Sequence, residues 1–78
     1  MKDIENSVKE FIIQEYKNAQ SYAQNEKDVV RWRHGASTVL QFSLFYLFPC
    51  YNKNLVDWWE NEMWEKFNEL ALDKRKHK

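Results

Sequence analysis

The sequence has few of the residues that cross-link a small fold or form its turns. Its 78 residues contain one cysteine, one glycine and one proline. One cysteine cannot form an internal disulfide, and so few glycine and proline residues leave little turn chemistry for a many-stranded β fold. A single core in a domain of this size supplies only a few kcal/mol. Stability must therefore come from dense aromatic packing, from self-association, or from both.

The chain also lacks net charge and a long apolar run. Twelve basic residues balance twelve acidic ones, which argues against a global electrostatic role on nucleic acid or an anionic membrane. The longest apolar run, residues 39–48, is half of the roughly 20 residues that a membrane span needs, and the first residues do not form an apolar secretion signal. We expect a cytoplasmic protein with no membrane partner. Cys50 is expected to be a free, non-catalytic thiol in such a reducing compartment.

Apolar residues recur at intervals of three and four along most of the chain, which is the period of an amphipathic helix. The pattern predicts helices at about residues 3–24, 26–47 and 55–73. The buried stripe of the first helix is expected to consist of Ile4, Val8, Phe11, Ile12, Tyr16, Ala19, Tyr22 and Ala23, and that of the second of Val29, Trp32, Ala36, Val39, Leu40, Ser43 and Leu47. Asn25 and Asn54 stand where they can cap the second and third helices, and Pro49 ends the second. Residues 40–48 also alternate as a strand would, but the chain offers no second strand to pair with them.

Short connections make neighbouring helices antiparallel. Residues 1–78 therefore read as one all-α domain, a three-helix antiparallel bundle with a basic C-terminal tail from about residue 74. The second helix is apolar on nearly all sides, which places it centrally between the other two. The third helix is expected to bury one stripe, formed by Val56, Trp59, Met63, Trp64, Phe67, Leu70 and Ala71.

Two charged residues interrupt the apolar stripes. Glu15 lies within the stripe of the first helix, and Arg33 lies at the edge of the stripe of the second. A buried carboxylate costs free energy unless it is paired. The antiparallel register brings the two residues together, so we predict a structural ion pair between them. The alternative, a catalytic acid at Glu15, has no nucleophile or metal ligand near it in the sequence.

No constellation of residues supports an enzyme. His34 and His77 fall into no zinc-binding spacing, and the lone Gly35 makes no phosphate-binding loop. The ExxE spacing of Glu62 and Glu65 resembles that of helical nucleotide pyrophosphatases, but the second carboxylate pair that holds magnesium in such sites is missing. We predict no catalytic residue, no metal and no cofactor, and interpret these carboxylates as a solvated face.

A surplus of aromatic side chains remains. The chain has four Trp, four Tyr and five Phe, more than three stripes can shelter. Trp58 is expected to project away from its stripe, Tyr51 lies in a loop, and Phe42 and Phe45 lie off the main face of the second helix unless the third helix covers them. Exposed aromatic groups mark interfaces. We predict a small non-enzymatic protein–protein interaction module that binds a protein partner or forms a homodimer through these four residues.

A second hypothesis is a nucleic-acid-associated regulator. Arg31, Lys53 and the basic tail, with Lys74, Arg75 and Lys76, would supply its phosphate contacts. Separately, the composition, rich in Lys, Asn, Glu and Gln, resembles that of small accessory proteins of phages and mobile elements in low-GC bacteria. That resemblance implies an inhibitor or regulator of a host factor, for example an anti-defence protein.

Overall fold

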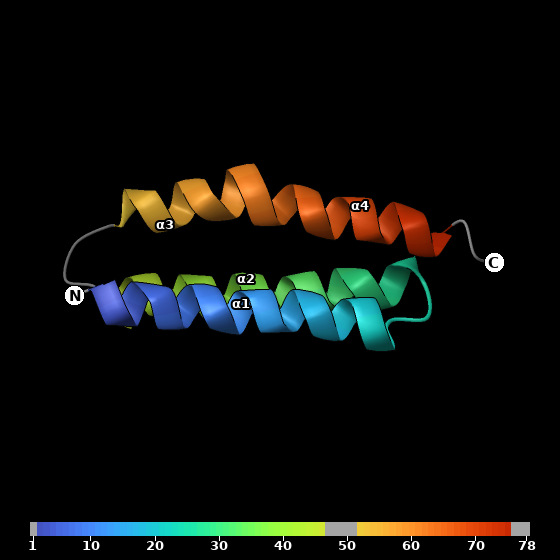
Figure 1. Cartoon of the computed structure of the whole chain (residues 1–78), viewed down its shortest axis with the longest axis horizontal. Coiled ribbons are helices and arrows are strands. Elements are labelled where there is room, and N and C mark those ends of the chain that lie inside the picture. The colour runs from blue at the N-terminus through green and yellow to red at the C-terminus, as the bar shows by residue number, and fades with distance from the viewer. Residues whose placement is uncertain (1, 47–51, 76–78) are drawn as a thin grey trace.

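The computed structural model describes residues 2–46 and 52–75, and within them it confirms the three-helix bundle (Figure 1). The first two helices are α1 (Lys2–Tyr22) and α2 (Glu26–Tyr46). The third helix is continuous in space and consists of α3 (Lys53–Trp58), the π-helical turn η1 (Trp59–Met63) and α4 (Trp64–Arg75). The alternating segment is helical over residues 40–46, so the strand alternative is wrong there. The assignments made for Cys50, Tyr51 and Lys76 lie outside the described residues.

The start of α2 is fixed by two hydrogen bonds that involve Asp28. The Asn25 Oδ1 atom accepts from the backbone N–H of Asp28 at 3.0 Å, as predicted for a capping residue. The Asp28 carboxylate in turn accepts from the backbone N–H of Gln24 at 3.0 Å. Because Glu26 and Asp28 also place negative charge in the first turn, this end of α2 is stabilised by its helix dipole as well.

The third helix begins two residues earlier than its sequence pattern predicted. Asn52, and not Asn54, is its N-cap: the Asn52 Oδ1 atom accepts from the backbone N–H of Leu55 at 3.1 Å. The same side chain also donates from Nδ2 to the Glu5 carboxylate on α1 at 2.8 Å. One asparagine therefore both starts the third helix and ties it to the first.

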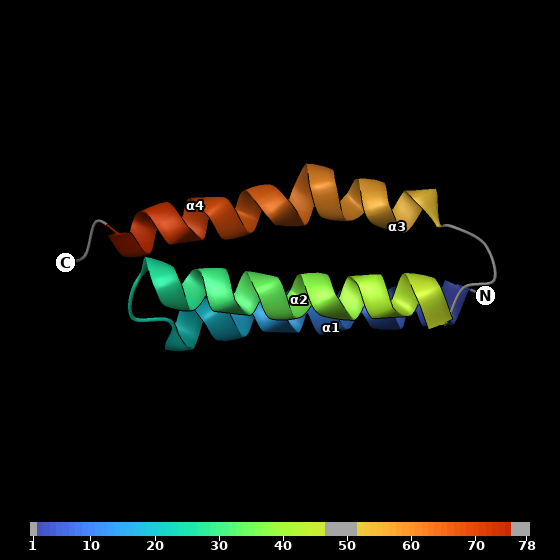
Figure 2. The same ribbon diagram turned by 180° about the vertical axis from the view of Figure 1, so that it is seen from behind.

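The three helices lie lengthwise against one another in a body of 44 × 19 × 16 Å. Figures 1 and 2 show α1 and α2 as an antiparallel pair, with the third helix running along one side of that pair. The second helix packs along both α1 and α4, which confirms its central place. No described helix is both long and apolar enough to cross a bilayer.

The core runs the full length of the bundle. Ala19 and Ala36 are fully buried and let α1 and α2 approach closely, while Phe67 fills the space that the third helix brings to them. The Phe67 ring meets the Tyr16 ring edge-on at 5.3 Å and the Trp59 ring at 6.0 Å between centroids. The buried apolar residues are Val8, Ile12, Ala19, Ala23, Val29, Ala36, Leu40, Leu55, Trp59, Met63, Phe67, Leu70 and Ala71.

The π-helical turn explains which side of the third helix is buried. Leu55, Trp59, Met63, Phe67 and Ala71 are buried at a constant interval of four residues. In a regular α-helix each interval of four advances the side chain by about 40°, so the series would drift by about 160° around the helix. The wider π turn at residues 59–63 accommodates one extra residue and returns the series to the same side.

Because the π turn shifts the helical phase, two residues of the expected stripe lie outside the core. Val56 is half-buried instead of lying at the core, where Leu55 takes its place. Trp64, which was also expected in the stripe, is exposed over 40% of its surface. Both residues would face the core only if residues 53–75 followed a single α-helical phase.

The half-buried Tyr16 makes stability sensitive to alkaline pH. Partial burial raises the pKa of its phenol above the ordinary value of 10.0, and the nearby Glu69 and Asp73 carboxylates raise it further, against a smaller lowering by the hydrogen bond from Gln20. The folded state thus holds this proton more tightly than the unfolded state. Its contribution to stability is fully present below pH 10 and is lost as the pH rises through the folded-state pKa.

We therefore expect Tyr16→Phe to reduce the loss of stability above pH 10. The measurement is urea unfolding of both proteins at a series of alkaline pH values, with Tyr22→Phe, at a largely exposed position, as the matched control. The control should lose stability in parallel with the wild type. Equal slopes for the wild type and Tyr16→Phe would contradict the prediction.

Candidate protein-binding face

The exposed aromatic residues gather on the side of the α1–α2 pair that is turned away from the third helix. At 100° per residue, Phe11 and Tyr22 on α1 differ by only about 20°, and Phe42 and Tyr46 on α2 by about 40°. Phe45 lies about 60° from Phe42 and forms the edge of this set. The opposite flank of α1 contacts the third helix instead. We call this side the outer face and define it by Ile4, Phe11, Glu15 and Tyr22 on α1 and by Asp28, Trp32, Gly35, Val39, Phe42, Phe45 and Tyr46 on α2.

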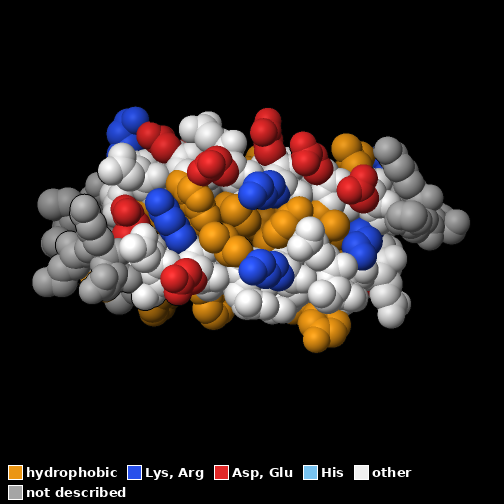
Figure 3. All heavy atoms as spheres, in the orientation of Figure 1, with side chains coloured by type: hydrophobic (Ala, Val, Ile, Leu, Met, Phe, Trp, Pro, Cys, Tyr) orange, Lys and Arg blue, Asp and Glu red, His pale blue; other side chains and the backbone are white. Residues whose placement is uncertain are grey.

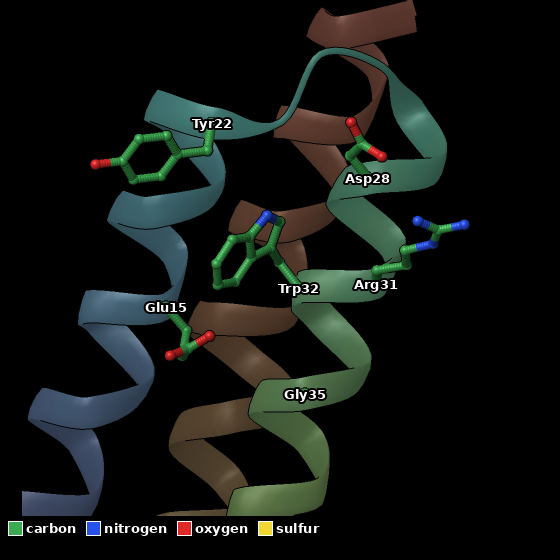
Figure 4. A pocket seen from close by; sticks show the side chains of 6 residues that line it. All are labelled: Glu15, Tyr22, Asp28, Arg31, Trp32 and Gly35. Atoms are coloured by element: carbon green, nitrogen blue, oxygen red, sulfur yellow. The ribbon is translucent and has the colours of Figure 1, made fainter.

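An open pocket of about 490 Å³ occupies one end of the outer face, between the two helices. Figure 4 looks onto it with the third helix behind. The Trp32 ring reaches from α2 towards α1, and the Glu15 carboxylate points from α1 into the same gap, while Tyr22 lies in front of α1. Arg31 also lines the pocket, but its side chain points to the far side of α2. Gly35 has no side chain to fill the pocket, and no atom lies within 4 Å of a Cβ placed there.

The other end of the outer face is aromatic. The rings of Phe42 and Tyr46 contact each other with their centroids 4.5 Å apart. The five exposed aromatic residues of the face have exposed fractions from 49% for Phe11 to 82% for Phe45. Figure 3 shows apolar side chains protruding along the lower edge of the molecule, the side away from the third helix. The third helix therefore does not cover Phe42 or Phe45.

Three of the five exposed aromatic residues on this face were not among the residues predicted to bind a partner. Phe11 and Tyr22 were expected in the buried stripe of α1, and Tyr46 was not predicted to contact a partner, but all three are exposed. The signal that finds them is a second set of positions on each helix, spaced alternately by four and three residues beside the buried set. On α2 this set is Asp28, Trp32, Gly35, Val39, Phe42 and Tyr46.

Trp58, which was expected to project away from its stripe, does not belong to the outer face. It is half-buried, packs against the core from the third helix, and has the Lys9 ammonium 5.5 Å from its ring centroid. The π turn is the physical reason. Once Leu55 and Trp59 define the buried side, Trp58 lies only about 60° from Leu55 and faces α1, so it does not project into solvent.

The predicted ion pair between Glu15 and Arg33 is not formed. Among the described residues, salt bridges join Lys53 to Asp57 at 2.9 Å and Arg75 to Glu26 at 3.7 Å. The lengthwise register was right, because Glu15 shares its pocket with Trp32 and Gly35, the neighbours of Arg33. The direction around α2 was wrong, since Arg33 lies about 100° from Trp32, on the side of the third helix.

Arg33 instead fastens α2 to α4. Its Nη1 atom donates to the Asn68 Oδ1 atom at 2.6 Å, and its guanidinium carbon lies 4.3 Å from the ring centroid of Trp64. A guanidinium stacked on indole and bonded at its edge is a stabilising arrangement that lysine would not reproduce. The partly exposed Trp64 is thus covered by a cation from the neighbouring helix.

The described basic residues considered for nucleic-acid contact are divided between the two ends of the third helix and α2. Lys53 begins the third helix and pairs with Asp57, whereas Lys74 and Arg75 end it, on the order of 30 Å away. The Lys74 ammonium donates to the backbone carbonyl of Gln20 at 3.0 Å. Arg31 is exposed on α2, five residues after Glu26, the residue that pairs with Arg75.

The acidic residues show no arrangement for a cation. Within residues 2–46 and 52–75, no three His, Cys, Asp or Glu side chains come together as metal ligands would. Glu62 and Glu65 are exposed. The outer face is therefore the candidate site. It offers apolar area with the carboxylates of Glu15 and Asp28, and Arg31 lies at its edge, beside the same pocket. No family model, no curated protein and no solved structure matches this chain.

Proposed function

We propose that this protein is a non-enzymatic interaction module that binds protein through the outer face. The observation that carries the proposal is the exposure of five aromatic side chains on one side of two helices: Phe11, Tyr22, Phe42, Phe45 and Tyr46. Large exposed apolar surfaces on small proteins mark interaction sites, and aromatic residues with few side-chain torsions are effective binding anchors.

The large aromatic rings on the third helix support this proposal by contrast, because cations from other helices cover them. Trp58 and Trp64, the large rings nearest the surface of the third helix, are each covered by a cation from a neighbouring helix. Within residues 2–46 and 52–75, no cation lies over an aromatic ring of the outer face in this way. A ring of this size contributes roughly 1.5–3 kcal/mol when buried, so the uncovered set is a large source of binding free energy.

The resemblance in composition to phage and mobile-element accessory proteins extends the proposal to an inhibitor or regulator of a host factor. In that role a host protein would meet the outer face. Nucleic-acid regulation is the competing function, and it would use dispersed cations of which Lys74 and Arg75 already contact acceptors within the fold. It predicts steep weakening of binding with salt, whereas an aromatic contact predicts weak salt dependence.

The test compares the proteins that three immobilised forms of this chain capture from a lysate of the native host. The three forms are the wild type, the outer-face variant Phe42→Ser/Tyr46→Ser and the control Leu72→Ser. Leu72 is an apolar residue on α4, away from the outer face, and is exposed over 53% of its surface, against 60% for Phe42 and 72% for Tyr46. We expect at least one protein to bind the wild type and the control but not the outer-face variant. A second copy of this chain counts as such a protein. Equal capture by all three, or capture abolished by nuclease or by moderate salt, would overturn the proposal.

A further inference from the structure

The outer face has the spacing of a helix-packing seam. On α2 its residues follow one another at intervals of four, three, four, three and four from Asp28 to Tyr46. On α1, Phe11 and Glu15 lie four residues apart. Ile4 precedes Phe11 by seven residues, and Tyr22 follows Glu15 by seven. Such spacing keeps side chains facing a partner helix along a left-handed crossing. In the α1–α2 pair this seam points to the side opposite the third helix. The pair thus presents half of a four-helix arrangement.

We infer that a second copy of this chain occupies the outer face, so that two α1–α2 pairs pack together about a twofold axis parallel to the helices. This inference rests on the proposed function and names its partner. With the axis in that direction, α1 of one copy lies against α2 of the other, and every neighbouring pair of helices is antiparallel. The contact is self-complementary, because each half of it is repeated by the symmetry.

The exposed area fits a dimer. The five aromatic residues are on average about two-thirds exposed, and a side chain of this kind buries roughly 150–250 Å², so together they offer roughly 500–800 Å² per copy. A stable interface of standard size buries about 800 Å² on each partner. The half-buried Ile4, Trp32 and Val39 lie on the same seam and supply much of the remainder.

The charges of the face are complementary between copies. Glu15 and Arg31 line one pocket, but Figure 4 shows Arg31 directed away from α1, and the salt bridges of the described residues include neither side chain. A twofold axis along the helices keeps each residue at its own height. Glu15 of one copy then meets α2 of the second copy within a turn of Arg31, and the same pair forms twice. A net charge of zero adds no repulsion between the copies.

The first experiment measures mass by light scattering after size exclusion at micromolar concentration. The wild type is expected at twice 9.6 kDa, Phe42→Glu at 9.6 kDa with its helical circular dichroism retained, and the control Leu72→Glu as a dimer. A dimer that persists in Phe42→Glu would overturn the location. A wild type that stays monomeric would overturn the second copy as occupant, and the capture experiment would then still decide the proposed function on its own.

The second experiment exchanges the charges. Glu15→Arg alone and Arg31→Glu alone should each raise the dissociation constant of the dimer by about tenfold, because each places like charges opposite one another twice. The double variant Glu15→Arg/Arg31→Glu should restore it. Only a second copy carries both exchanged charges, so only a dimer regains its affinity in the double variant. A different partner protein would keep its own charges and would face the reversed charges of this chain. Failure of the double variant to recover while both single variants weaken the dimer would overturn the proposed axis.

Discussion

Replacing Phe67 by alanine is expected to lower the free energy of unfolding by about 3–5 kcal/mol. Phe67 is fully buried and makes ring contacts with both Tyr16 on α1 and Trp59 in the π turn. Its loss therefore leaves a cavity where the third helix meets the first. A domain of 78 residues has a total stability of only about 4–12 kcal/mol, so this one change removes a large share of it.

The measurement is chemical unfolding followed by circular dichroism, with all proteins at one fixed concentration because a dimer would link stability to concentration. Leu72→Ala is the control on the same helix, and its exposed side chain should change stability by less than about 1 kcal/mol. Phe67→Leu, which refills most of the cavity, should fall between the two. A Phe67→Ala protein as stable as the control would show that the third helix does not pack on α1 through this residue.

The positions of the helices along the chain could be predicted because they depend on local signals. The three-and-four periodicity, the capping Asn25 and the short connection at residues 23–25 are all readable without tertiary structure, and the structure agrees with them to within two residues for α1 and α2. The core of α1 and α2 also followed, since Ile12, Val29 and Leu40 lie on the stripes that the periodicity defines.

Direction around a helix was harder to predict than position along it. An error of one residue turns a side chain by about 100°, which is the difference between facing α1 and facing α4 on a central helix. This is why Arg33 was paired with Glu15, although it bonds to Asn68 on the other neighbour. It is also why Phe11 and Tyr22, which lie at the edge of the α1 stripe, were assigned to the core when they line the outer face.

The π turn could not be found from a periodicity that assumes 3.6 residues per turn throughout. Its trace in the sequence is the unbroken interval of four from Leu55 to Ala71, which no single α-helical phase can bury. The competing stripe through Val56 and Trp64 satisfied the regular period and was preferred for that reason. Burial of four large side chains, Leu55, Trp59, Met63 and Phe67, outweighs the poorer hydrogen-bond geometry of one widened turn.

Deleting Asn61 is expected to leave the fold intact, with a free energy of unfolding equal to that of the wild type within about 1 kcal/mol or higher. Asn61 is exposed in the middle of η1, so its removal takes nothing from the core. It shortens the interval between Trp59 and Met63 to three residues. A regular α-helix then carries every buried residue from Leu55 to Ala71 within about 50° of one direction, and the π turn is no longer needed.

The matched control is deletion of Lys17, an exposed residue in the regular α-helix α1. That helix has no extra residue to absorb the loss, so the deletion turns Ala19 and Ala23 by about 100° relative to Val8 and Ile12 and should unfold the protein. Thermal unfolding of the two deletion variants beside the wild type separates them, because the difference between the deletions should amount to most of the stability of the domain. If deleting Asn61 were as damaging as deleting Lys17, the extra residue in η1 would not be what keeps the two halves of the third helix facing one core.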